Sequence, residues 1–148
     1  PLALGATLAG ASKEQLAALA RFGAPVGEAF QMRDDLLGTF GDSAVTGKPV
    51  GNDLRVGKRT ALVREAETSI AESNRAPLTR VLGRADATDA EIREAMAFLT
   101  SSGARARVEA RLDALMRDAD AALEAAPISD EGKTLLRSIA LKIAQRAS

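Results

Sequence analysis

Two adjacent aspartates, Asp34 and Asp35, stand near the expected end of a long helix and precede a glycine-rich segment with two lysines, Lys48 and Lys58. Carboxylate oxygens are hard ligands of the kind that Mg²⁺ takes one or two at a time, together with waters and phosphate oxygens. Lysine ammonium groups bind phosphate oxygens as compact charges. These residue types therefore predict a site for Mg²⁺ and a diphosphate.

The spacing on the helix supports a shared site. Gln31, Asp34, Asp35 and Gly38 follow one another at intervals of three, one and three residues, so we expect them on one helical face. The helix dipole disfavours carboxylates near a C-terminus by about 0.3 to 1 kcal/mol. An acidic pair between apolar neighbours also needs a cation nearby. The context favours a functional pair over an ordinary solvated helix end.

The glycine-rich segment places the lysines close to an expected helix start. Lys58 comes directly before that helix, and helix N-termini favour anions. Asp53, between Lys48 and Lys58, is placed to hold a lysine or to reach a metal through water. The segment is not a phosphate-binding P-loop, because the spacing after Gly41 is one residue too long and Pro49 replaces the required Ser or Thr.

Composition narrows the chemistry. The 148 residues contain no Cys and no His, which excludes disulfides, thiol nucleophiles, histidine catalysis and the usual zinc ligands. Equal numbers of basic and acidic residues leave no net charge to attract nucleic acid or a membrane surface. No apolar run is long enough to span a membrane, and no secretory signal is present, so we expect a cytoplasmic protein. Because the sequence opens on Pro1 within an apolar segment, we expect part of a longer protein.

Abundant alanine and leucine, with few aromatic or β-branched residues, predict an all-α protein. Ser12 with Gln15 and Thr88 with Glu91 form expected capping boxes, and Pro25 is expected to kink the second helix. Residues 39–58 are expected to be a loop. The expected helices cover residues 2–10, 13–38, 60–73, 78–82, 89–100, 104–125 and a last segment after Ser129 or Asp130, with Leu135, Leu136, Ile139 and Ile143 on one face.

The segments FQMRDDLLGTFGD and TGKPVGNDLRVGKRT resemble the second aspartate-rich region of the trans-isoprenyl diphosphate synthases, the family of farnesyl and geranylgeranyl diphosphate synthases. The resemblance covers most of residues 1–62 in register and the later helices in pattern only. The sequence resembles bacterial members of the family, in particular actinobacterial polyprenyl synthases. It implies an isoprenoid synthase helical bundle, of which residues 1–148 form the C-terminal portion of a single domain.

The resemblance implies a Mg²⁺-dependent prenyltransferase, usually a homodimer, that condenses an allylic diphosphate with isopentenyl diphosphate into a longer all-trans prenyl diphosphate. The chain would supply charge neutralisation and a dry cavity. The implied catalytic residues are Gln31, Asp34 and Lys48. The implied metal ligands are Asp34 and Asp35, the implied diphosphate-binding residues are Lys48 and Lys58, and Asp42 and Asp53 are implied as supporting acids.

The chain departs from the family pattern at two points. Gly38 replaces the third aspartate of the motif, and Asp42 is a candidate to stand in for it. The first aspartate-rich motif and the isopentenyl-diphosphate site lie upstream of Pro1, so we expect residues 1–148 to be inactive alone. Two alternatives remain open: a non-catalytic homologue or regulatory subunit, and a helical interaction module with surface charges. Retention of Gln31, Lys48 and Lys58 argues against the first.

Overall fold

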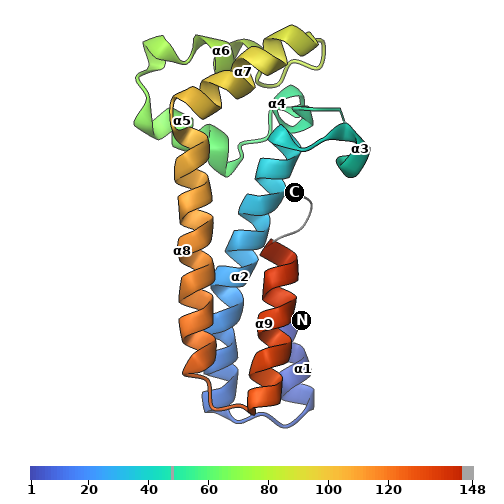
Figure 1. The fold of residues 1–148 in the computed structure, drawn as a ribbon, viewed down its shortest axis with the longest axis vertical. Coiled ribbons are helices and arrows are strands. Elements are labelled where there is room, and N and C mark those ends of the chain that lie inside the picture. The colour runs from blue at the N-terminus through green and yellow to red at the C-terminus, as the bar shows by residue number, and fades with distance from the viewer. Residues whose placement is uncertain (48, 145–148) are drawn as a thin grey trace. The chain divides into compact units, whose positions relative to one another are not determined.

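The computed structural model describes residues 1–47 and 49–144, and within these stretches all regular structure is helical, as predicted (Figure 1). The described residues form two compact units. The first contains Pro1–Gln31 and the described residues from Leu112 onward, and the second contains Met32–Arg111. Helices α2 (Lys13–Phe40) and α8 (Ala104–Glu124) each contribute to both units. The described residues include no helix long and apolar enough to cross a membrane.

The first unit consists of four helical segments that lie side by side (Figure 1): α1 (Leu2–Leu8), the first part of α2, the last part of α8, and α9 (Asp130–Ala144). Helix α2 continues through Pro25, so that residue does not end the helix. The core of this unit contains Phe22, Val26, Ala119, Leu123 and Ala140, with Leu136 and Ile143 packed against it. Only part of the apolar face predicted for α9 packs against the core, because Leu135 and Ile139 are exposed.

Side-chain caps define the helix starts where the sequence predicts them. Ser12 and Gln15 exchange the two hydrogen bonds of a capping box, at 2.9 and 3.2 Å. Thr88 and Glu91 form a second capping box at the start of α7 (Asp89–Ser101). Ser129 accepts a hydrogen bond from the N–H of Gly132 at 3.2 Å and caps α9. Each cap satisfies backbone donors that the first turn leaves without partners.

The second unit contains short helices that the sequence did not predict. Residues 39–58 were expected to be a loop, but α2 extends to Phe40 and two helices follow, α3 (Ser43–Thr46) and α4 (Asn52–Val56). Helix α4 lies between Gly51 and Gly57, which both adopt positive φ. Helices α5 (Ala61–Ser69), α6 (Ala76–Val81), α7 and the first part of α8 follow, with a 3₁₀ turn at Glu72–Asn74.

Helix α4 is packed into the core of the second unit. Leu54 is fully buried together with Val63, Val81, Ile92 and Leu99. Burying side chains of this size stabilises a fold by about 1.5 to 3 kcal/mol each. The core therefore fixes the position of the short helix, and with it the polar residues that α4 carries.

The end of α4 makes a close contact with the turn after α6. The N–H of Gly83 donates to the carbonyl of Leu54 at 2.9 Å. A Cβ atom on Gly57 would lie only 2.9 Å from the Cα of Gly83, so the two backbones touch directly. Arg55 adds a second attachment, because its guanidinium pairs with Asp89 at 2.6 Å and donates to the carbonyl of Ala87. These contacts hold the end of α4, which precedes Lys58 by two residues, in a defined position.

Candidate functional site

Three carboxylates of the second unit converge on the ammonium group of Lys58. Its Nζ lies 3.0 Å from Oδ1 of Asp35, 3.3 Å from Oδ2 of Asp53 and 3.8 Å from Oδ2 of Asp34. Two of the acids come from α2, the third comes from α4, and Lys58 follows α4 directly. Three of the predicted acids and one of the predicted lysines are therefore neighbours in space.

The two adjacent aspartates differ sharply in environment. The side chain of Asp34 is 60% exposed, whereas that of Asp35 is 8% exposed. Successive residues on a helix point in directions about 100° apart, so neighbours do not face the same surroundings. Oδ2 of Asp35 accepts a hydrogen bond from the backbone N–H of Ala61 at 2.9 Å. Asp35 is thus held by the first turn of α5 as well as by Lys58, while Asp34 faces solvent.

The carboxylate of Asp53 lies directly against Gly38. A Cβ atom on Gly38 would lie 2.3 Å from Oδ2, 2.4 Å from Cγ and 2.8 Å from Oδ1 of Asp53. Asp53 itself is 8% exposed, and Lys58 donates its backbone N–H to the Asp53 carbonyl at 2.9 Å. Asp53 therefore holds Lys58 through both its main chain and its carboxylate.

The electrostatics of the cluster favour a charged lysine. Burial lowers the pKa of Lys58, but the hydrogen bond and charge of Asp35, together with those of Asp53, outweigh it, so the pKa is raised above 10.5. The ammonium is accordingly retained at neutral pH. One ammonium against three carboxylates leaves an excess of negative charge, which an added cation would offset.

The other predicted residues have different surroundings or lie outside the described residues. Gln31 belongs to the first unit, and its side chain is exposed. Asp42 caps α3, where its Oδ1 accepts from the N–H of Ala44 at 2.9 Å. Lys48 lies outside the described residues. Among those described, no group of three or more His, Cys, Asp or Glu side chains forms a metal site by its own ligands.

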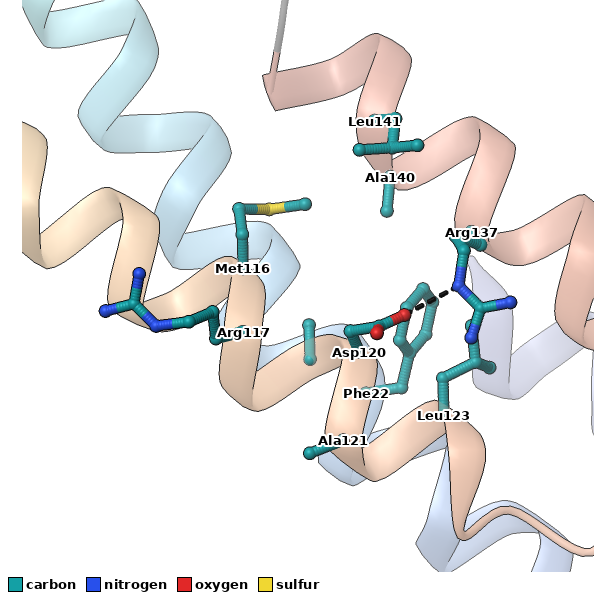
Figure 2. A pocket seen from close by; sticks show the side chains of 10 residues that line it. Phe22, Met116, Arg117, Asp120, Ala121, Leu123, Arg137, Ala140 and Leu141 are labelled. Atoms are coloured by element: carbon teal, nitrogen blue, oxygen red, sulfur yellow. Dashed lines mark hydrogen bonds and ion pairs between the residues drawn. The ribbon is translucent and has the colours of Figure 1, made fainter.

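The first unit contains a hollow of about 420 Å³, which is within the size range of ligand pockets (Figure 2). Its walls are mainly apolar, and Figure 2 shows Asp120 facing Arg137, which it contacts at 2.6 Å. Asp120 belongs to α8, and Arg137 belongs to α9. The pocket offers no second cluster of acids. The lining residues are Phe22, Met116, Arg117, Ala119, Asp120, Ala121, Leu123, Arg137, Ala140 and Leu141.

Comparison with known proteins identifies the family. The family model described as "Polyprenyl synthetase" matches residues 1–99, and the chain belongs to this family. A geranylfarnesyl diphosphate synthase of Aeropyrum pernix is 37% identical over 144 residues, which are 97% of this chain and 44% of that protein. A geranylgeranyl diphosphate synthase of Mycobacterium tuberculosis is 54% identical over 71 residues, which are 48% of this chain and 20% of that protein.

Solved structures agree with this assignment. The geranylgeranyl pyrophosphate synthase of Corynebacterium glutamicum, complexed with isoprenyl diphosphate and magnesium, superposes with a TM-score of 0.85 at 36% identity. The match covers 97% of this chain and 41% of that structure. The predicted family and the predicted isoprenoid synthase helical fold are both confirmed. The chain spans less than half the length of the relatives and structures named here.

One contact of the cluster was not predicted from the sequence. Gly38 was predicted to mark the loss of a third acid, and in the structure it also lies against the carboxylate of Asp53, where a Cβ atom would overlap it. No local signal indicated this contact, because Gly38 was expected to be the last residue of its helix. Thr60, which accepts from the N–H of Val63 at 3.3 Å, was likewise not singled out.

Proposed function

We propose that the protein is a Mg²⁺-dependent prenyltransferase that condenses an allylic diphosphate with isopentenyl diphosphate into a longer all-trans prenyl diphosphate. Residues 1–148 would form the C-terminal portion of its single synthase domain. The convergence of Asp34, Asp35 and Asp53 on Lys58 is the observation that carries the proposal. Membership of the polyprenyl synthetase family gives the chemical class.

The residues present fit a magnesium ion. The carboxylate of Asp34 faces solvent beside the cluster, and the three carboxylates carry more negative charge than the Lys58 ammonium offsets. Mg²⁺ usually keeps several waters and binds through one or two carboxylates plus phosphate oxygens, so a complete protein cage is not required. We assign Asp34 as the first ligand of the ion and Asp35 as its fixed neighbour. Once bound, Mg²⁺ supplies positive charge that stabilises a departing diphosphate.

Lys58 is suited to bind the diphosphate beside Asp34. A lysine ammonium carries three N–H donors. Asp35 and Asp53 lie close enough to receive two of them, whereas Asp34, at 3.8 Å, is beyond hydrogen-bond distance. One donor therefore remains on the side of the exposed Asp34 carboxylate. A phosphate oxygen bound there would contact Lys58 and an ion on Asp34 together.

The other parts of the proposal come from the family resemblance. Lys48 is proposed as a second diphosphate-binding lysine, Gln31 as a residue near the allylic end, and Asp42 as a supporting acid. A homodimer in the cytoplasm belongs to the same proposal. These assignments stay predictions, and substitution of each residue in the full-length protein would test them.

The decisive experiment measures product formation from an allylic diphosphate and isopentenyl diphosphate with the full-length protein. Asp34→Asn should lower turnover by at least about 100-fold with little change in melting temperature, because a lost metal ligand removes charge stabilisation. Asp118→Asn, a change on α8, is the matched control and should leave turnover unchanged. Equal turnover in wild type and Asp34→Asn would remove Asp34 from the mechanism.

A second candidate function rests on Gly38, where the family motif has an acid: a non-catalytic homologue or regulatory subunit of a prenyl synthase. It would bind inorganic diphosphate in the presence of Mg²⁺ but form no product under the same conditions. The assay of the full-length protein thus separates the two candidates directly.

A further inference from the structure

We infer that a hollow between α5 and α6 is a second anion site, which binds a small oxyanion of the phosphate class. The hollow has a volume of about 220 Å³ and lies within the second unit. Its walls are formed by other side chains than those of the cluster around Lys58. The inference therefore goes beyond the proposed function and does not depend on it. The lining residues are Arg59, Glu67, Arg75, Leu78, Thr79 and Leu82.

Arg75 brings an unpaired positive charge to this hollow. Its Nε is buried and donates to no atom of the described residues. Within residues 1–47 and 49–144 its guanidinium also forms no ion pair. The backbone of Arg75 is fixed at the start of α6, where its carbonyl accepts the N–H groups of Leu78 and Thr79, both at 3.0 Å. Because a buried donor without an acceptor is unfavourable, Arg75 is suited to bind an anion that enters the hollow.

Arg59 supplies a second guanidinium from the position directly before the N-cap of α5. It pairs with Glu67 of the same helix, and the two side chains are 63% and 31% exposed. A pair that is this open to solvent contributes little and exchanges partners readily. The lining thus has two guanidinium groups and one carboxylate, which leaves an excess of positive charge. An oxyanion that replaces Glu67 as the partner of Arg59 would contact Arg75 as well.

The size and donors of the hollow favour inorganic phosphate. Pockets for larger ligands measure about 300 to 1,000 Å³, so a volume of about 220 Å³ fits a compact anion and not an isoprenoid chain. The hydroxyl of Thr79 already donates to the Arg75 carbonyl at 3.1 Å, so the arginines are the donors that remain. Each guanidinium fork binds two oxygens side by side. Phosphate has four oxygens for two forks, whereas a carboxylate has only two.

Calorimetric titration of the full-length protein with inorganic phosphate tests the inference. EDTA is present throughout, so that no Mg²⁺-dependent site contributes. The wild type should bind one phosphate per chain. Arg75→Gln should weaken binding by about 10- to 100-fold, as expected for the loss of hydrogen bonds between charged groups. Arg64→Gln changes an exposed arginine of α5 outside the lining, so it is the matched control and should bind like the wild type.

Two further variants separate a binding role from a merely structural one. Glu67→Gln should strengthen phosphate binding by about 2- to 5-fold, because it removes the acid that competes for Arg59. Arg75→Met should raise the melting temperature without phosphate, since it removes an unpaired buried donor. The same variant should lose the stabilisation that phosphate gives the wild type. A purely structural arginine would lower the melting temperature when replaced and would leave the response to phosphate unchanged.

Four outcomes would overturn the inference: a wild type that binds no phosphate, an Arg75→Gln variant that binds like Arg64→Gln, weaker binding by Glu67→Gln, or loss of binding in Lys58→Met. The last result would place the anion at the Lys58 cluster instead. The proposed function fails independently of all four, when Asp34→Asn and the wild type show equal turnover.

Discussion

The carboxylate of Asp35 joins two segments that are 26 residues apart, because its Oδ2 accepts the backbone N–H of Ala61 at 2.9 Å while its Oδ1 pairs with Lys58 at 3.0 Å. The bond ties the last part of α2 to the first turn of α5. Asp34, the preceding residue, makes no comparable attachment to another described residue and is exposed. One aspartate of the pair therefore fastens the structure, and the other is available to a ligand.

Because Asp35 is buried and bonded while Asp34 is exposed, we expect unequal losses of stability from two conservative changes. Asp35→Asn should reduce the free energy of unfolding by about 1 to 3 kcal/mol, since it weakens a buried hydrogen bond to a charged group. Asp34→Asn should change it by no more than about 0.5 kcal/mol, as is usual for exposed positions. Urea unfolding of both variants measures the difference. Similar losses in the two variants would contradict the division.

The raised pKa of Lys58 predicts a loss of stability at alkaline pH. A group whose folded pKa exceeds its unfolded value stabilises the fold fully below the unfolded pKa, here 10.5, and loses that contribution as pH rises through the folded pKa. The melting temperature of the wild type should therefore fall more steeply above about pH 10.5 than that of Lys58→Met. Parallel curves for the two proteins would show that the ammonium contributes nothing.

The capping box of α7 predicts a dependence on acid pH. The hydrogen bond from the backbone of Thr88 lowers the pKa of Glu91 below 4.5, so its stabilising effect is present above 4.5 and is lost as pH falls through the folded pKa. Thr88→Ala should lower the free energy of unfolding by about 1 kcal/mol at neutral pH. The difference in melting temperature between wild type and Glu91→Gln should shrink in acid. A constant difference would argue against the linkage.

The contact between Gly57 and Gly83 predicts unequal costs for two alanine substitutions. Both residues have positive φ, which costs a residue with a side chain about 1 to 2 kcal/mol. Gly83→Ala should lose about this amount, because its Cβ would meet the Cα of Gly57 at an ordinary 3.9 Å. Gly57→Ala should lose a further 1 to 3 kcal/mol or so, because its Cβ would overlap the Gly83 backbone. Denaturant titration measures both, and equal losses would reject the overlap.

Local sequence patterns predict the long helices of this protein well. Apolar residues at intervals of three to four and the caps at Ser12, Thr88 and Ser129 are properties of neighbouring residues. The structure has a helix start at each of these caps. The prediction for the glycine-rich segment was wrong because it relied on local patterns alone. Its glycines were taken as signs of a loop, whereas Gly51 and Gly57 flank α4, whose Leu54 is fully buried in the core. Tertiary burial decided the conformation there, and short-range propensity did not.

The candidate site was predictable in its residue types but not in its division of roles. The sequence grouped Asp34, Asp35, Asp53 and Lys58 as site residues, and the structure brings these four together. Nothing in the sequence indicated that Asp35 would accept the Ala61 N–H, because that contact depends on how the segments between α2 and α5 fold. Contacts between distant segments follow from packing, which local spacing does not encode.

The close approach of position 38 to Asp53 also constrains how this site changes over evolutionary time. In this chain, a side chain added at position 38 would have to displace the Asp53 carboxylate from where it lies. The residue tolerated at one of these positions therefore depends on how the side chain at the other is placed. We expect substitutions at the two positions to show non-additive effects on stability.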